Sequence, residues 1–155
     1  MTTQLQRVLG IINKYQYENN ITKECLTNVQ IIFQYMLTHE PITPVIIKPV
    51  IAVIECENNL TICTNHVVIE IDNNIIDTSY EYNKYSNVVY YENYNDFIIN
   101  TFGSNYKGLY TKKMYERAFN EFGKISAKIN KTKKIMRINN KYYDLLYTRI
   151  SNILN

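Results

Sequence analysis

The spacing of apolar residues changes along this chain, and that change constrains the fold more than any other feature of the sequence. Between Thr3 and Tyr17, and again between Lys23 and Thr38, apolar side chains recur every three or four residues, which is typical of amphipathic helices. Between Pro41 and Asp77 the pattern becomes short β-branched runs separated by polar turns, which is typical of an antiparallel sheet. The sequence therefore predicts an α+β fold.

The strands and the remaining helices follow from the same patterns. The predicted strands are Pro44–Ile54, Leu60–Cys63, His66–Ile71 and Asn74–Asp77, with a further strand at Val88–Tyr91. The predicted C-terminal helices are Asn93–Phe102, Thr111–Phe122 and Lys141–Leu154. We expect two N-terminal helices packed on a small antiparallel sheet, with C-terminal helices covering the rest.

The second helix places a cysteine close to its start. A polar break ends the first helix, and Thr22 is predicted to be the N-cap of the second, which puts Cys25 at the third helical position. One side of this helix is predicted to face the core through Leu26, Val29, Phe33, Met36 and Leu37.

Composition limits the class of protein. The chain has 155 residues, 46% of them hydrophobic, which predicts a single domain over residues 1–155. Asn, Ile, Tyr and Lys together make 72 residues, and their AT-rich codons indicate a low-GC genome such as that of a large DNA virus, a protist or a bacterium. The three cysteines form no C-x-x-C pair, which favours a reducing compartment over a disulfide framework or a zinc site. We therefore expect a cytoplasmic protein, in the host cell if it is viral, with no signal peptide, membrane span, metal or cofactor.

Charge divides the chain into two parts. The predicted acidic helix-plus-sheet part, residues 1–100, holds 5 Lys or Arg and 11 Asp or Glu. The predicted basic helical part, residues 101–155, holds 12 Lys or Arg and 3 Asp or Glu. A basic surface of this kind fits an anionic partner such as nucleic acid, a membrane or an acidic protein, or the acidic part of its own chain.

One basic run in the C-terminal part could contact phosphates. Its cations, in a predicted loop, are Lys128, Lys131, Lys133, Lys134 and Arg137, and the tyrosines that follow as stacking surfaces are Tyr142, Tyr143 and Tyr147. These residues predict a nucleic-acid-binding module. The alternative interpretation is a solvated connection between helices with its tyrosines in the core.

Cys25 is the best candidate for a nucleophile. A cysteine nucleophile reacts as the thiolate, which a helix N-terminus and a neighbouring imidazole stabilise. Only His39 and His66 can supply the imidazole. Cys63 is a weaker candidate, although it is close to His66 in the sequence, because a separation of three residues puts the two on opposite faces of a strand.

His66 has a carboxylate within reach if the following hairpin has a two-residue turn. Asp72-Asn73 suits such a turn, since both residue types tolerate positive φ. Val68 then lies opposite Asp77, and His66 and Asp77 become diagonal neighbours about 7–8 Å apart on one face. A three-residue turn would separate them.

The stretch Asn65–Ser79, NHVVIEIDNNIIDTS, resembles the H-x-W-x-E-x-x-G-x-x-x-D-P-S/T hairpin of transglutaminase-like and papain-like cysteine hydrolases. With Cys25 earlier in the chain, the resemblance covers residues 19–79. It implies Cys25 as nucleophile, His66 as general base and then acid, and Asp77 as the group that orients the imidazole. The chain departs from the family pattern at Thr78, where the family has Pro, and no Trp follows Cys25 or His66.

The resemblance implies acyl transfer on a protein or peptide substrate, by a peptidase, amidase or isopeptidase. The oxyanion would be bound by the Cys25 N–H and a side-chain amide, with Asn19 and Asn20 as candidates and Gln16 as a weaker one. Two alternatives remain open: Cys25 is a small buried hydrophobe, or the chain is a catalytically inactive interaction protein of the same fold.

Overall fold

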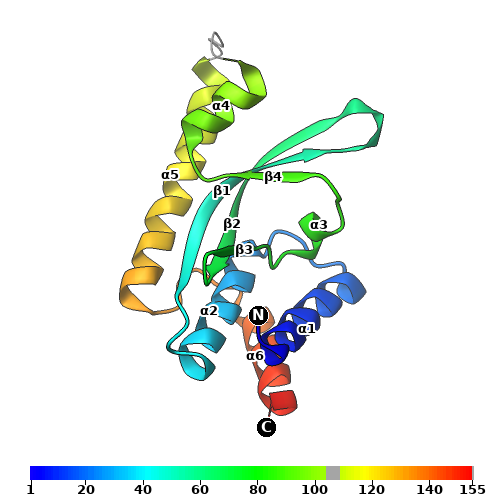
Figure 1. Cartoon of the computed structure of the whole chain (residues 1–155), viewed down its shortest axis with the longest axis vertical. Coiled ribbons are helices and arrows are strands. Elements are labelled where there is room, and N and C mark those ends of the chain that lie inside the picture. Colours follow the sequence, from blue (N-terminus) through cyan, green and yellow to red (C-terminus); the bar gives the residue numbers. More distant parts are fainter. Residues whose placement is uncertain (104–108, 155) are drawn as a thin grey trace.

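The chain folds into six helices and one four-stranded antiparallel sheet in the part that this computed structural model describes, residues 1–103 and 109–154 (Figure 1). In chain order the elements are α1 Thr3–Asn19, α2 Cys25–His39, β1 Val45–Glu55, a 3-10 turn at Glu57–Asn59, β2 Thr61–Ile71, β3 Asn74–Ile76, α3 Tyr80–Asn83, β4 Val88–Tyr91, α4 Tyr94–Phe102, α5 Leu109–Thr132 and α6 Asn140–Leu154. The predicted α+β class is confirmed.

The sheet is built on one long hairpin. Its strand order is β3-β2-β1-β4, and β1 pairs with β2 along its whole length, from Val45 opposite Ile71 to Glu55 opposite Thr61. The prediction of two separate strands at Leu60–Cys63 and His66–Ile71 was wrong, because β2 continues through the polar residues between them. The far end of this hairpin extends beyond β4 (Figure 1).

The turn from β2 to β3 has the predicted two-residue form. Asp72 and Asn73 take positive φ angles of 50° and 67°, and Ile69 pairs with Ile76. Positive φ at both central residues matches the right-handed twist of the flanking strands. The same register, extended by one pair, puts Val68 opposite Asp77.

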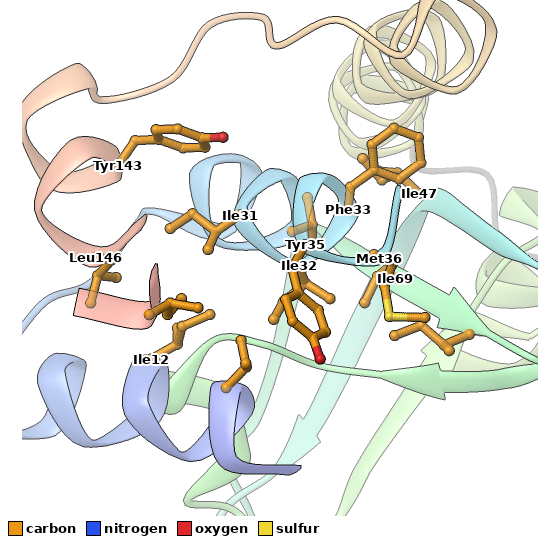
Figure 2. Close-up of a cluster of buried hydrophobic side chains, with 14 of the residues drawn as sticks. Ile12, Ile31, Ile32, Phe33, Tyr35, Met36, Ile47, Ile69, Tyr143 and Leu146 are labelled. Carbon is orange, nitrogen blue, oxygen red and sulfur yellow. The ribbon is translucent and has the colours of Figure 1, made fainter. Parts of the chain in front are cut away.

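α2 is the central helix of the fold, and nine of its 15 residues are buried. It contacts β1 and β2 on one side and α1 and α6 on the other. Figure 2 shows its side chains between Ile12 of α1, Ile47 and Ile69 of the sheet, and Tyr143 and Leu146 of α6. The prediction of a single core-facing side was incomplete, since Ile31, Ile32 and Tyr35 are also buried. Because α2 buries side chains toward both the sheet and the other helices, it fixes the layers on both sides of it.

α2 begins two residues later than predicted. Lys23 takes a positive φ of 61°, which a right-handed helix excludes, and its N–H donates to the Glu81 carboxylate at 2.9 Å. Glu24 therefore takes the N-cap position in place of Thr22, and Cys25 becomes the first helical residue. Its N–H is one of those that helix geometry leaves without an intrahelical acceptor.

One edge of β1 is covered by a side chain of α5 instead of a strand. The Asn130 carboxamide donates to the Ile47 carbonyl and accepts from the Ile47 N–H, both at 2.9 Å. Ile47 therefore points its backbone groups away from β2, and Pro49, two residues on, does the same. Pro49 has no N–H to pair, and β4 begins its pairing only at Ile51.

The C-terminal helices complete the core. α5 is longer than the predicted Thr111–Phe122, and it runs along one side of the sheet (Figure 1). A second, smaller cluster forms where Ile51 of β1 meets Phe97 and Ile98 of α4.

Candidate functional site

His66 and Asp77 meet where β2 runs beside the edge strand β3. His66 lies on β2 and Asp77 directly follows β3, and His66 Nε2 lies 2.9 Å from Asp77 Oδ1. Both side chains are removed from water, with exposed fractions of 0% and 3%. The two-residue turn between β2 and β3 sets this contact through the pairing register.

The hydrogen bond with Asp77 fixes the tautomer of His66. A carboxylate can only accept, so Nε2 carries the proton. Nδ1 is buried, and no described group forms a hydrogen bond of ordinary geometry with it. Cys25 lies near enough to the ring to be one of the groups that raise the pKa of His66.

The protonation of His66 depends on two opposing effects. Burial lowers the pKa of His66, but hydrogen bonding and charge from Asp77 and from Cys25 together raise the pKa to about 9. The imidazolium is therefore the favoured form at neutral pH. A buried imidazolium held by a carboxylate can stabilise a nearby thiolate.

This protonation predicts a pH dependence. The pKa of His66 is about 9 in the folded chain and 6.5 for an ordinary histidine, so protonation stabilises the fold. That contribution is fully present below about pH 6.5 and is lost as the pH rises through about 9. We expect the His66 Cε1–H signal in NMR to titrate near pH 9, and to move to lower pH in Asp77→Asn. A midpoint at or below 6.5 in the unmodified chain would contradict the assigned geometry.

Tyr90 and Ser79 occupy the remaining positions on Asp77. The Ser79 N–H donates to Oδ1 at 2.9 Å, and the Tyr90 hydroxyl donates to Oδ2 at 2.7 Å. Burial raises the pKa of Tyr90 well above its usual value, and the charge and hydrogen bond of Asp77 raise it further. Tyr90 thus remains a neutral donor. The sequence analysis did not single out Tyr90, because tyrosine is so common in this chain that its presence at one position indicates no function.

Tyr82 of α3 covers the imidazole. Its ring centroid lies 3.9 Å from that of His66, tilted by 37°. Burial raises the pKa of Tyr82 to about 12, and the nearby charge of Glu81 adds to this effect. Sequence reasoning missed Tyr82, and its position depends on α3, which the sequence patterns did not predict.

The Gln16 side chain connects the helix of Cys25 to the turn of Asp77. Its Nε2 donates to the Thr78 carbonyl at 2.8 Å and to the Ile12 carbonyl at 3.3 Å. Its Oε1 accepts from Asn28 Nδ2 at 3.2 Å and from the Tyr80 N–H at 3.1 Å. Both amide protons are used inside the protein, so Gln16 holds the site together and has no donor left for an oxyanion.

Asn19 and Asn20 end α1. Asn19 Nδ2 donates to the Tyr15 carbonyl at 3.0 Å, and Asn20 takes the left-handed conformation, with its N–H on the Gln16 carbonyl. Among the described residues, no hydrogen bond joins either side chain to Cys25 or His66. The oxyanion role of these two amides stays a prediction.

The three thiols have different surroundings. All are free and half-buried. Cys63 packs against the smaller cluster around Phe97, as its position on β2 predicts, and burial raises the pKa of its thiol. Cys25 is the thiol that acts on the His66 imidazole.

The predicted nucleic-acid-binding residues are only partly arranged as expected. Lys128 and Lys131 lie on α5 and not in a loop. All five predicted cations, Lys128, Lys131, Lys133, Lys134 and Arg137, are exposed. Tyr142 and Tyr143 are buried in the core, 6% and 7% exposed, and Tyr147 packs against it, so Tyr142 and Tyr143 cannot serve as the predicted stacking surfaces.

The described residues contain neither a membrane-spanning helix nor a cluster of metal-binding side chains. None of their helices has the length and apolar character needed to cross a bilayer. Nor do three of their His, Cys, Asp or Glu side chains gather closely enough to hold a metal ion.

No protein-family model, curated protein or solved structure matches this chain significantly.

Proposed function

We propose that the chain is a cysteine-dependent acyl-transfer enzyme of the papain-like or transglutaminase-like type, with Cys25, His66 and Asp77 as its triad. The observation that carries the proposal is the buried His66 imidazole: Asp77 holds its Nε2 at 2.9 Å, its Nδ1 has no described hydrogen-bond partner, and Cys25 is among the groups that raise its pKa. In the proposed triad Asp77 orients the ring, and Nδ1 is the nitrogen left to exchange a proton with Cys25.

The elements that carry these residues support the proposal. Cys25 is the first residue of a 15-residue helix, so its sulfur lies at the positive end of the helix dipole. The free N–H groups of the first helical turn are donors for a developing oxyanion. The three residues follow the chain order of the papain-like and transglutaminase-like pattern. They also lie, as in that pattern, at a helix start and on a hairpin.

The chemistry follows from the protons. The Cys25 thiolate attacks an amide, thioester or isopeptide carbonyl and forms an S–C bond, and the carbonyl oxygen takes the negative charge. The imidazolium gives its Nδ1 proton to the leaving group as the scissile bond breaks, which leaves a thioester on Cys25 and a neutral imidazole. Nδ1 then accepts a proton from water or an acceptor amine as it attacks the thioester, and the thiolate is released. The Nε2–H stays on Asp77 throughout.

Alkylation of the thiols tests the proposal without a substrate. At about pH 6 an ordinary cysteine is only about 0.3% thiolate, so a thiol paired with an imidazolium should react faster by about 10- to 100-fold. We expect iodoacetamide at this pH to modify Cys25 before Cys56 and Cys63, as read by mass spectrometry of the folded chain.

Cys56 and Cys63 serve as internal controls, because all three thiols are half-buried. A urea-unfolded sample should show three similar rates. If Cys63 or Cys56 reacts first in the folded chain, or if the three rates are equal, then Cys25 is not an activated nucleophile and the interaction-protein interpretation holds.

A further inference from the structure

The hydroxyl of Tyr90 forms a hydrogen bond with Asp77 but has no role in the proposed triad. Asp77 is 3% exposed, so water cannot complete its hydrogen bonding. Its Oδ1 is shared by the His66 ring and the Ser79 N–H, whereas its Oδ2 accepts from Tyr90 at 2.7 Å, a short distance typical of a charge-assisted bond.

Tyr90 reaches Asp77 across the face of the sheet. It lies on β4, at one edge, and Asp77 follows β3, at the other, with β2 and β1 between them. The residue opposite Tyr90 on β1 is Ala52, which is fully buried. The small alanine side chain leaves room for the phenol ring to cross β1 toward Asp77.

We propose that Tyr90 is a positioning residue, whose hydroxyl holds the Asp77 carboxylate so that Oδ1 stays on His66 Nε2 and the imidazole keeps one orientation. This inference rests on the proposed function. With donors on both oxygens, the carboxylate cannot rotate about its Cβ–Cγ bond. The imidazole is held in turn, since its Nε2–H follows Oδ1. The Tyr90 hydroxyl donates to Asp77, so in this proposal Tyr90 acts on His66 through that carboxylate.

Tyr90→Phe removes the hydroxyl and keeps the ring. Because a hydrogen bond to an ionised group is stronger than most, we expect iodoacetamide at about pH 6 to modify Cys25 about tenfold more slowly in this variant. Tyr91→Phe is the matched control. Tyr91 is the next residue on β4, and it faces the opposite side of the sheet, where it packs beside Phe97. Iodoacetamide should modify Cys25 in Tyr91→Phe at the same rate as in the unmodified chain.

The same substitution in a His66→Ala background separates positioning from a structural role. Without an imidazole to hold, Tyr90→Phe should change the Cys25 rate by less than about twofold, whereas a general loosening of the fold would alter both backgrounds equally. An equal effect in both backgrounds, no effect in either, or an unfolded Tyr90→Phe by circular dichroism would overturn the inference.

Failure of the proposed function looks different. In that case Cys25 is not preferentially modified in the unmodified chain, and His66→Ala leaves its rate unchanged. A reactive Cys25 that depends on His66 but not on the Tyr90 hydroxyl would keep the triad and remove only Tyr90 from it.

Discussion

Replacing His66 with alanine will slow the alkylation of Cys25 at about pH 6 by up to about 100-fold. In the proposed triad the His66 imidazolium stabilises the Cys25 thiolate, and without it we expect the thiolate fraction to be that of an ordinary cysteine, about 0.3% at this pH. Once a substrate is known, turnover should fall by a factor of order 10²–10⁴, because the proton transfer is lost as well. The rate at Cys56, measured in the same sample, corrects for any change in the fold.

Asp77→Asn should have a smaller effect than His66→Ala. Asparagine keeps the volume and one acceptor oxygen for Nε2, but it removes the charge that favours the imidazolium. This ranking distinguishes an orienting carboxylate from a turn-forming one. Asp77→Asn could instead unfold the chain while Cys25 stays reactive in the folded fraction. Asp77 would then stabilise the turn before Ser79, and the hairpin would resemble the family in fold and not in activity.

The second large effect concerns stability. Ile32 is fully buried in α2, and its truncation in Ile32→Ala should lower the free energy of unfolding by about 2–5 kcal/mol, through lost apolar burial and the cavity left behind. Ile42→Ala removes the same atoms from a side chain that is 95% exposed, and should cost less than about 0.5 kcal/mol. Urea titration should show a lower midpoint with an unchanged slope for Ile32→Ala. Similar midpoints for the two variants would mean that α2 is not the centre of the core.

Local patterns predicted the parts of this structure that local chemistry determines. Asp72 and Asn73 tolerate positive φ, so the turn, the register and the meeting of His66 with Asp77 could all be derived from a few neighbouring residues. α1 and α6 were predicted from the spacing of their own apolar residues, which is also a local signal. Boundaries were less reliable, as the start of α2 shows: it depends on Lys23, whose N–H finds its acceptor on Glu81, 58 residues away.

The rest of the candidate site depends on long-range packing. Tyr90 meets Asp77 only because β4 joins the far edge of β1, and no local pattern encodes that pairing. The sequence suggested Gln16 only as a weaker candidate for the oxyanion site. Its burial at 1% and its four hydrogen bonds appear only when α1, α2 and the segment after β3 are assembled.

The carboxamide of Asn130 has a consequence for the order of events during synthesis. It satisfies the open backbone edge of β1 at Ile47, but it is 83 residues further along the chain. Until the ribosome has released α5, that edge presents an unpaired N–H and C=O beside a nearly complete hairpin, and another nascent chain could add a strand there. We therefore expect chains truncated before Asn130 to aggregate through β1, and full-length Asn130→Ala to show the same tendency more weakly.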